Sequence, residues 1–165
     1  MDESGLDLRM TLQYARAEGG ERIKMAVPCN RGAQVSIIGA ISSKGIEAAL
    51  YGEWATDGDI FYAFIEQCLV PKLRSGHVVI MDNVRFHYRK DIAPLIEAKG
   101  ATVVYLPPYS PDFSPIENMW SKMKGILRKL MPRSMPELQD KLKNALESIT
   151  TSNLLSWFKH CGYSV

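Results

Sequence analysis

The pattern of hydrophobic and polar positions changes along the chain from strand-like to helix-like. Two apolar, β-rich runs, residues 34–42 ("QVSIIGAIS") and 46–54 ("IEAALYGEW"), are separated by the turn sequence "SKG" and predict an antiparallel hairpin. Residues 59–73 then repeat apolar side chains at near-helical spacing. A helix that covers the hairpin is therefore expected, and Pro71 marks its end or a kink.

The next part of the chain has the order strand, helix, strand. Residues 77–81 ("HVVIM") and 102–106 ("TVVYL") are short apolar runs, and an amphipathic stretch over about 89–99, closed by Gly100, lies between them. This order is typical of a βαβ unit. The two strands are therefore expected to be parallel, with a right-handed crossover.

Helical patterns dominate from Pro115 to the end of the sequence. They are interrupted at residues 131–137 ("MPRSMPE"), where Ser134 begins a new helix with Glu137 three residues further on. The expected order is a strand at the start, a hairpin, a helix, a βαβ unit and then helices. The sequence thus predicts a mixed α/β fold in layers.

Composition limits the classes of protein. With 165 residues, of which 46% are hydrophobic and 23% charged, one globular domain can bury roughly 70% of its unfolded surface. Cys29, Cys68 and Cys161 are widely spaced and form no CxxC pair, so neither a disulfide framework nor a zinc knuckle is indicated. No apolar run approaches the roughly 18 residues that span a bilayer, and no signal peptide pattern begins the chain, so a cytoplasmic protein without a membrane partner is expected. The net charge of +2 does not by itself indicate nucleic-acid binding.

Asp82 is the first candidate for chemistry. It directly follows the apolar run 77–81, which places it at the carboxyl end of a central strand, where crevices form in open α/β sheets. Asp82 and Asn83 could equally cap a turn, since both residue types favour turns. A nucleotide-hydrolysing Walker B strand is excluded, because the chain has no glycine-rich GxxxxGK[ST] loop.

Glu117 is the second candidate, and its sequence context allows two interpretations. Ser114, Pro115 and Glu117 fit a capping box, in which the glutamate reaches back to the serine amide. The helix that follows carries one apolar stripe, formed by Ile116, Met119, Trp120, Met123, Leu127 and Leu130. Glu117 lies about 100° from Ile116 around the helix axis, so its carboxylate can also face a crevice between helix and sheet.

Three segments together resemble a known family. They are "DESG" (2–5), "MDNVRFH" (81–87) and "LPPYSPDFSPIENMWSKMK" (106–124), and the similarity extends to "YARAEGGERI" and "WFKHCGY". In this order and at this spacing they resemble the DDE transposases of the IS630/Tc1/mariner superfamily, most closely the bacterial IS630 group. The resemblance implies that residues 1–165 form one ribonuclease H-like DDE catalytic domain. Its mixed sheet would combine an antiparallel hairpin with parallel strands and be flanked by helices.

The resemblance also implies an active site. In this fold the strand that ends at Asp82 lies parallel to the first strand, so that Asp2 and Asp82 become neighbours and a helix brings Glu117 to both. These catalytic residues would hold two Mg²⁺ ions, for which Mn²⁺ can substitute, because adjacent carboxylates repel one another unless cations compensate them. One ion would activate water and the other would stabilise the leaving 3′ oxygen, after which the freed 3′-OH can attack target DNA.

Residues near these acids have weaker assignments. Asn83 could hydrogen-bond a metal-ligating carboxylate or only stabilise a turn, and His87 could contact the scissile phosphate, orient Asp82 or be a structural histidine. Asp112 is expected to form an Asx-turn, and Trp120 to lie in the core. Basic residues near the site are candidate contacts to DNA phosphates, although charged helix faces are often merely solvated: Arg85, Arg89, Lys90, Lys122, Lys124, Arg128, Lys129 and Arg133.

Members of this family carry helix-turn-helix domains before the first catalytic aspartate, whereas here only Met1 precedes Asp2. The chain is then expected to lack that DNA-binding region, either as one half of a split transposase that works with a separate N-terminal half or as a truncated copy. The implied function is DNA cleavage and strand transfer at insertion-sequence ends. The protein would be nucleoid-associated and could form a homodimer, with transposon ends and TA target sites as partners. Two alternatives stay open: an inactive remnant or interaction domain that still binds DNA, and a ribonuclease H-like nuclease.

Overall fold

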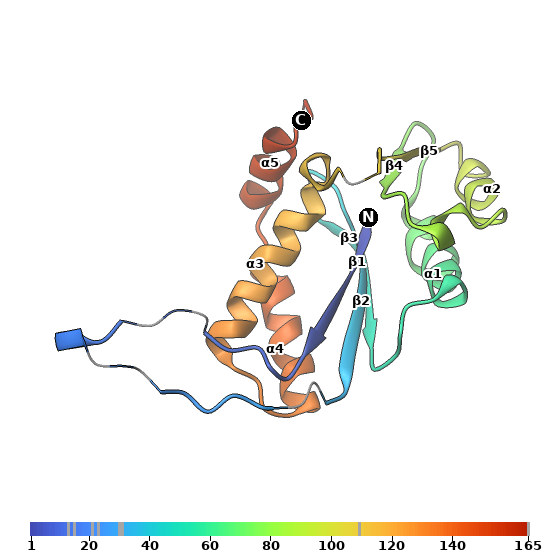
Figure 1. The fold of residues 1–165 in the computed structure, drawn as a ribbon. Helices are drawn as coiled ribbons and strands as arrows, with labels where there is room; N and C mark the ends of the chain where they lie inside the picture. Colours follow the sequence, from blue (N-terminus) through green and yellow to red (C-terminus); the bar gives the residue numbers. More distant parts are fainter. Residues whose placement is uncertain are drawn as a thin grey trace.

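The computed structural model describes residues 1–12, 14, 16–20, 22, 24–29, 32–108 and 110–164. Its larger sheet has three antiparallel strands in the order β1 (Asp2–Asp7), β2 (Gln34–Ile41) and β3 (Ile46–Gly52). A second sheet pairs β4 (Val78–Met81) with β5 (Thr102–Tyr105) in parallel. The predicted mixed α/β fold, with an antiparallel hairpin and a parallel pair of strands, is confirmed (Figure 1).

Helices lie on both sides of the larger sheet (Figure 1). On one side are α1 (Gly58–Phe64), continued by a π-helical turn (Ile65–Leu69) and a 3-10 turn (Val70–Lys72), and α2 (Ile92–Glu97). On the other side are α3 (Pro115–Leu130), α4 (Met135–Glu147) and α5 (Thr151–His160). Further 3-10 turns are formed by Glu18–Gly20, Arg85–Tyr88 and Pro111–Phe113.

Among the described residues, none of the helices combines the length and the hydrophobicity that crossing a bilayer requires.

The alternation of side chains along β2 explains why the protein has a core on each side of the sheet. Val35 and Ile37 pack against α3 and α4, whereas Ile38 and Ala40 pack against α1, because successive residues of a strand point to opposite faces. Most of the apolar stripe predicted for the helix after Pro115 is buried in the first of these cores, as Ile116, Met119, Trp120, Met123 and Leu127. Leu130, also predicted on this stripe, is exposed, because it lies at the end of α3.

The predicted helix over about 89–99 is shorter in the structure. The 3-10 turn Arg85–Tyr88 ends in an extended Arg89 (ψ 128°), so α2 begins only at Ile92. Its end agrees with the prediction, because Gly100 has a φ of 71°, a conformation that glycine adopts without strain.

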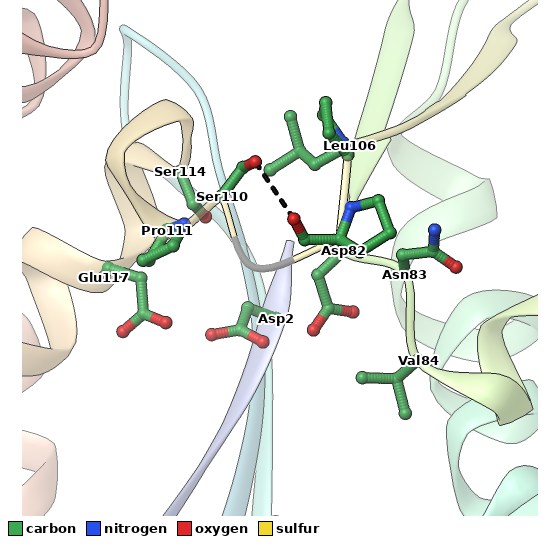
Figure 2. A pocket seen from close by; sticks show the side chains of 11 residues that line it. Asp2, Asp82, Asn83, Val84, Leu106, Ser110, Pro111, Ser114 and Glu117 are labelled. Atoms are coloured by element: carbon green, nitrogen blue, oxygen red, sulfur yellow. Dashed lines mark hydrogen bonds between the residues drawn. The ribbon is translucent and has the colours of Figure 1, made fainter.

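The relation between β1 and β4 also differs from the expected one. No ladder joins them within the described ranges, since β1 pairs with β2 and β4 with β5. A single hydrogen bond links them, from the Met1 nitrogen to the Ile80 oxygen at 2.8 Å. The strand ends that carry Asp2 and Asp82 nevertheless meet at one pocket (Figure 2).

Candidate active site

Three acidic side chains from separate parts of the chain line one pocket of about 390 Å³. Asp2 begins β1, Asp82 follows β4, and Glu117 lies in the first turn of α3. Figure 2 shows their carboxylates directed to the same side, with Asp2 between the other two. The other lining residues are mostly apolar and include Val84, Leu106, Pro107, Pro108 and Pro111. The structure thus brings together the three acids that the sequence singled out.

The proline-rich wall is held in place from the C-terminal end of the chain. The Tyr163 hydroxyl donates a hydrogen bond to the carbonyl oxygen of Phe113 at 2.7 Å. Phe113 ends the 3-10 turn that leads into α3. The approach to Glu117 is therefore tied to the segment after α5, a contact that the sequence did not predict.

Glu117 does not cap its helix. Ser114 is the N-cap and Pro115 the first helical residue, as predicted, but the Ser114 hydroxyl accepts no hydrogen bond from the described helix amides. The Glu117 amide instead donates to the Ser114 carbonyl oxygen at 3.2 Å. The predicted capping box is therefore wrong. At α4, by contrast, the Ser134 hydroxyl accepts from the Glu137 amide at 3.3 Å, as expected.

Asp2 is held by the core behind the pocket. Its Oδ2 accepts a hydrogen bond from the Trp120 indole Nε1 at 2.9 Å. Burial raises the pKa of Asp2 to about 7, and the carboxylates of Glu3 and Glu117 add to this rise, although hydrogen bonds from the Glu3 backbone and from Trp120 oppose it. The Asp2 carboxyl group is thus close to half protonated at neutral pH when no cation is bound.

Trp120 lies in the core, as predicted, and its contact with Asp2 depends on a glycine. Gly39 is the β2 partner of Asp2 in the sheet. A Cβ atom on Gly39 would approach the Trp120 ring to 2.8 Å, closer than real Cβ contacts come. Gly39 therefore makes room for the indole to lie against the strand and reach Asp2.

Gly39→Ala is expected to destabilise the protein by about 1–3 kcal/mol, because the added methyl group overpacks a filled core and pushes the Trp120 ring away. Urea unfolding measures this change. Gly125→Ala is the matched control, since Gly125 lies inside α3 and an added Cβ meets no atom of the described structure within 4 Å. That variant should gain roughly 0.5–1 kcal/mol. A Gly39→Ala protein as stable as the control would contradict the close approach of Trp120.

His87 is fully buried between two acidic side chains. Its Nε2 lies 2.9 Å from Glu3 Oε1, and its Nδ1 lies 2.6 Å from Asp82 Oδ1. Burial by itself lowers the pKa of His87, but the contacts with Asp82 and Glu3 outweigh it and raise that pKa to about 9. Of the roles considered for His87, contact with a phosphate in the pocket does not fit a buried ring, whereas orienting Asp82 does.

Glu3 was not among the predicted site residues. It follows Asp2 on the same strand, so the two side chains point to opposite faces, Asp2 towards Trp120 and Glu3 towards His87. The alternation of side chains along a strand predicts that Glu3 and Asp2 point to opposite faces of the sheet. Its partner lies 84 residues away, and no local pattern connects the two.

The donor groups of the pocket fit hard divalent cations. Asp2, Asp82 and Glu117 offer carboxylate oxygens, which Mg²⁺ and Mn²⁺ prefer. Asp82 Oδ1 is buried and has no hydrogen-bond partner of good geometry among the described residues, although His87 Nδ1 lies 2.6 Å away. As they stand, no three Asp, Glu, His or Cys side chains of the described ranges are gathered closely enough to ligate one ion.

Two residues predicted to contact DNA make their contacts within the protein. Arg89 forms ion pairs with Asp59 and Asp91, which tie α1 to the segment before α2. Lys122 donates to Asn153 Oδ1 at 2.5 Å and so links α3 to α5. These contacts favour structural roles for both.

The other predicted residues lie around the pocket. Asn83 lines it, with no hydrogen bond from its side chain to a described residue, whereas Asp112 lies on the neighbouring surface and not in the lining. Arg133 donates to the carbonyl oxygens of Leu8 and Met10 and holds the segment after β1. Of the remaining basic residues, Arg85, Lys90 and Lys129 are exposed, whereas Lys124 and Arg128 are half-buried.

The chain matches a family model described as DDE superfamily endonuclease over residues 1–139. Its fold is similar to that of the Mos1 transposase paired-end complex with left transposon end, with a TM-score of 0.77, 14% identity and coverage of 96% of this chain and 50% of that chain. For the Mos1 Strand Transfer Complex the TM-score is 0.76 and the identity 14%, and the match covers 96% of this chain and 49% of that chain. For the mariner Mos1 paired end complex with Mg the TM-score is 0.74 and the identity 14%, and the match covers 97% of this chain and 52% of that chain.

This likeness confirms the expected ribonuclease H-like fold. The chain spans about half the length of the Mos1 chains that it matches. No curated protein matches the sequence closely.

Proposed function

The chain belongs to the DDE superfamily endonuclease family, and on that basis we propose that it is the catalytic domain of a transposase of the IS630 group. It would cut DNA at the ends of an insertion sequence and join the freed 3′ ends to target DNA, with TA as the expected target. The observation that carries the proposal is the meeting of Asp2, Asp82 and Glu117, from three separate elements, in one pocket. Water or a 3′-OH is the attacking group in such reactions, so no side-chain nucleophile is needed.

Asp2, Asp82 and Glu117 would hold two Mg²⁺ ions, or Mn²⁺ in their place. When bound, these ions supply an activated water and stabilise the leaving 3′ oxygen. One solved structure with a similar fold is the mariner Mos1 paired end complex with Mg, which supports the choice of metal. The protein's own contribution is to fix the carboxylates: Trp120 holds Asp2, and His87 packs against Asp82.

Recognition of the element ends is proposed to need a partner. The similar Mos1 chains are about twice as long, and one of them was solved as a paired-end complex with a left transposon end. We propose that transposon ends are partners of this domain and that a homodimer brings two ends together.

The proposal is tested by incubating the protein with a duplex that carries an insertion-sequence end and mapping the products. We expect nicks that leave a 3′-OH, require Mg²⁺ or Mn²⁺ and disappear with EDTA. Asp82→Asn should reduce cleavage about 10³-fold or more while DNA binding persists, because it removes a charged ligand. Asp112→Asn is the control, since Asp112 is exposed outside the pocket lining, and it should cut as wild type does.

Other outcomes would replace the proposal. DNA binding without cleavage in either metal would favour an inactive remnant. Cleavage of RNA–DNA hybrids with no preference for element ends would favour a ribonuclease H-like nuclease.

A further inference from the structure

A second groove, of about 370 Å³, lies between the end of β1 and α3. Its charged lining residues are Arg9, Lys124, Arg128 and Asp7. Three cationic side chains thus face one carboxylate. Such an excess of positive charge in a concave surface attracts anions.

The groove continues the line of the acidic pocket. Lys124 and Arg128 follow Glu117 by 7 and 11 residues, a spacing that places all three on one face of α3. Strand β1 runs the same course, from Asp2 in the acidic pocket to Asp7 in the groove. The helix rise puts the two cations about 10 and 16 Å from Glu117 along the axis. At 3.4 Å per nucleotide of one strand, this is roughly three to five nucleotides of DNA.

The cations of the groove differ in what they already contact. Arg9 is held by Asp7, whose Oδ2 lies 2.8 Å from Nη2 and 3.2 Å from Nε, so the guanidinium group is fixed at the groove wall. Lys124 and Arg128 are half-buried and have no hydrogen bond or ion pair with any residue in the described part of the chain. Their charges are therefore available to a ligand.

We propose that the groove formed by Arg9, Lys124 and Arg128 binds backbone phosphates of the DNA strand that passes through the acidic pocket, about three to five nucleotides from the bond that is cut. The choice of DNA as the ligand rests on the proposed function. Contacts to phosphates carry no sequence information, so the groove contributes affinity and position but does not read bases. Each contact also makes binding more sensitive to salt.

The test measures binding alone, with the whole chain and a fluorescently labelled duplex of arbitrary sequence in the absence of divalent metal. Fluorescence anisotropy across a series of salt concentrations gives the slope of log K against log salt. Lys124→Ala/Arg128→Ala should reduce that slope by about 2, or about 1 for each lost phosphate contact, and weaken binding at low salt by about tenfold or more. Lys124→Gln/Arg128→Gln should behave alike and keeps much of the side-chain packing, which guards against a folding defect.

Lys143→Ala/Lys159→Ala is the charge-matched control. Both lysines are exposed, on α4 and α5, and neither lines the groove. The control should change the slope by well under 1. Any of three results would overturn the groove proposal. The slope could change equally in the groove variants and the control, it could stay unchanged in the groove variants, or the wild type could show no salt-dependent DNA binding.

Cleavage in Mg²⁺, measured separately, distinguishes failure of the groove from failure of the proposed function. Wild-type cleavage combined with unchanged binding by the groove variants overturns the groove alone. Groove-dependent binding without any cleavage supports the groove and overturns the transposase activity.

Discussion

Glu117→Gln is expected to reduce Mg²⁺-dependent DNA cleavage by about 10³-fold while the free energy of unfolding changes by less than about 0.5 kcal/mol. Glutamine has nearly the same size and still forms hydrogen bonds, but it lacks the charge that a metal ligand supplies. Because Glu117 is exposed at the pocket and its carboxylate has no hydrogen bond to the described residues, little stability depends on it. Cleavage rates and urea unfolding of the same preparation measure the two effects.

Two serine variants serve as controls for the capping alternative. Ser114→Ala should leave stability nearly unchanged, because the Ser114 hydroxyl does not cap α3 in the described structure. Ser134→Ala should cost about 1 kcal/mol, because its hydroxyl accepts the Glu137 amide. A Glu117→Gln protein with full activity would exclude Glu117 as a metal ligand.

The capping box shows where local sequence fails. Ser114 and Ser134 stand in the same context, each followed by proline within two residues and by glutamate three residues on. Ser134 has a ψ of 160°, whereas Ser114 has a ψ of 96° because it also closes the preceding 3-10 turn, donating to the Pro111 oxygen at 2.9 Å. The fold of the proline-rich segment, and not the helix signal, decides the direction of the serine hydroxyl.

The secondary structure was predictable because its signals are local. The hairpin, the parallel strands around α2 and the C-terminal helices follow from turns, periodicity and breakers within a few residues. The meeting of Asp2 and Asp82 followed only from the resemblance to a family. The contacts behind them were not predicted, since Trp120 reaches Asp2 across 118 residues and His87 reaches Glu3 across 84. Such contacts depend on how the layers pack.

Asp2→Asn is expected to stabilise the metal-free protein by about 2–3 kcal/mol at pH 8 and by much less at pH 4. Burial raises the pKa of Asp2 from 3.8 to about 7. The folded state therefore favours the protonated acid, and this contribution to stability is full below the unfolded pKa and is lost as pH rises through about 7. Asparagine is always neutral, and its side-chain oxygen can still accept the hydrogen bond from Trp120, so the variant avoids that loss.

His87 also makes the metal-free protein less stable at high pH. Comparison of the wild type with Asp2→Asn separates the effect of Asp2 from that of His87. Its pKa is raised from 6.5 to about 9, so its contribution is full below about 6.5 and is lost as pH rises through 9. Because His87 contacts Asp82 and Glu3 and not Asp2, this loss is the same in wild type and Asp2→Asn and cancels in their difference.

Metal binding should show the opposite dependence on pH. A cation must displace the proton from Asp2, so the stabilisation of the wild type by Mg²⁺ should grow as pH rises from about 5.5 to 8. In Asp2→Asn it should be weak at every pH, because one charged ligand is gone. Thermal unfolding with and without Mg²⁺ across this range measures both proteins. Equal stabilisation of the wild type at pH 5.5 and pH 8 would mean that Asp2 does not bind the ion, and the pocket would then lose the carboxylate that stands between Asp82 and Glu117.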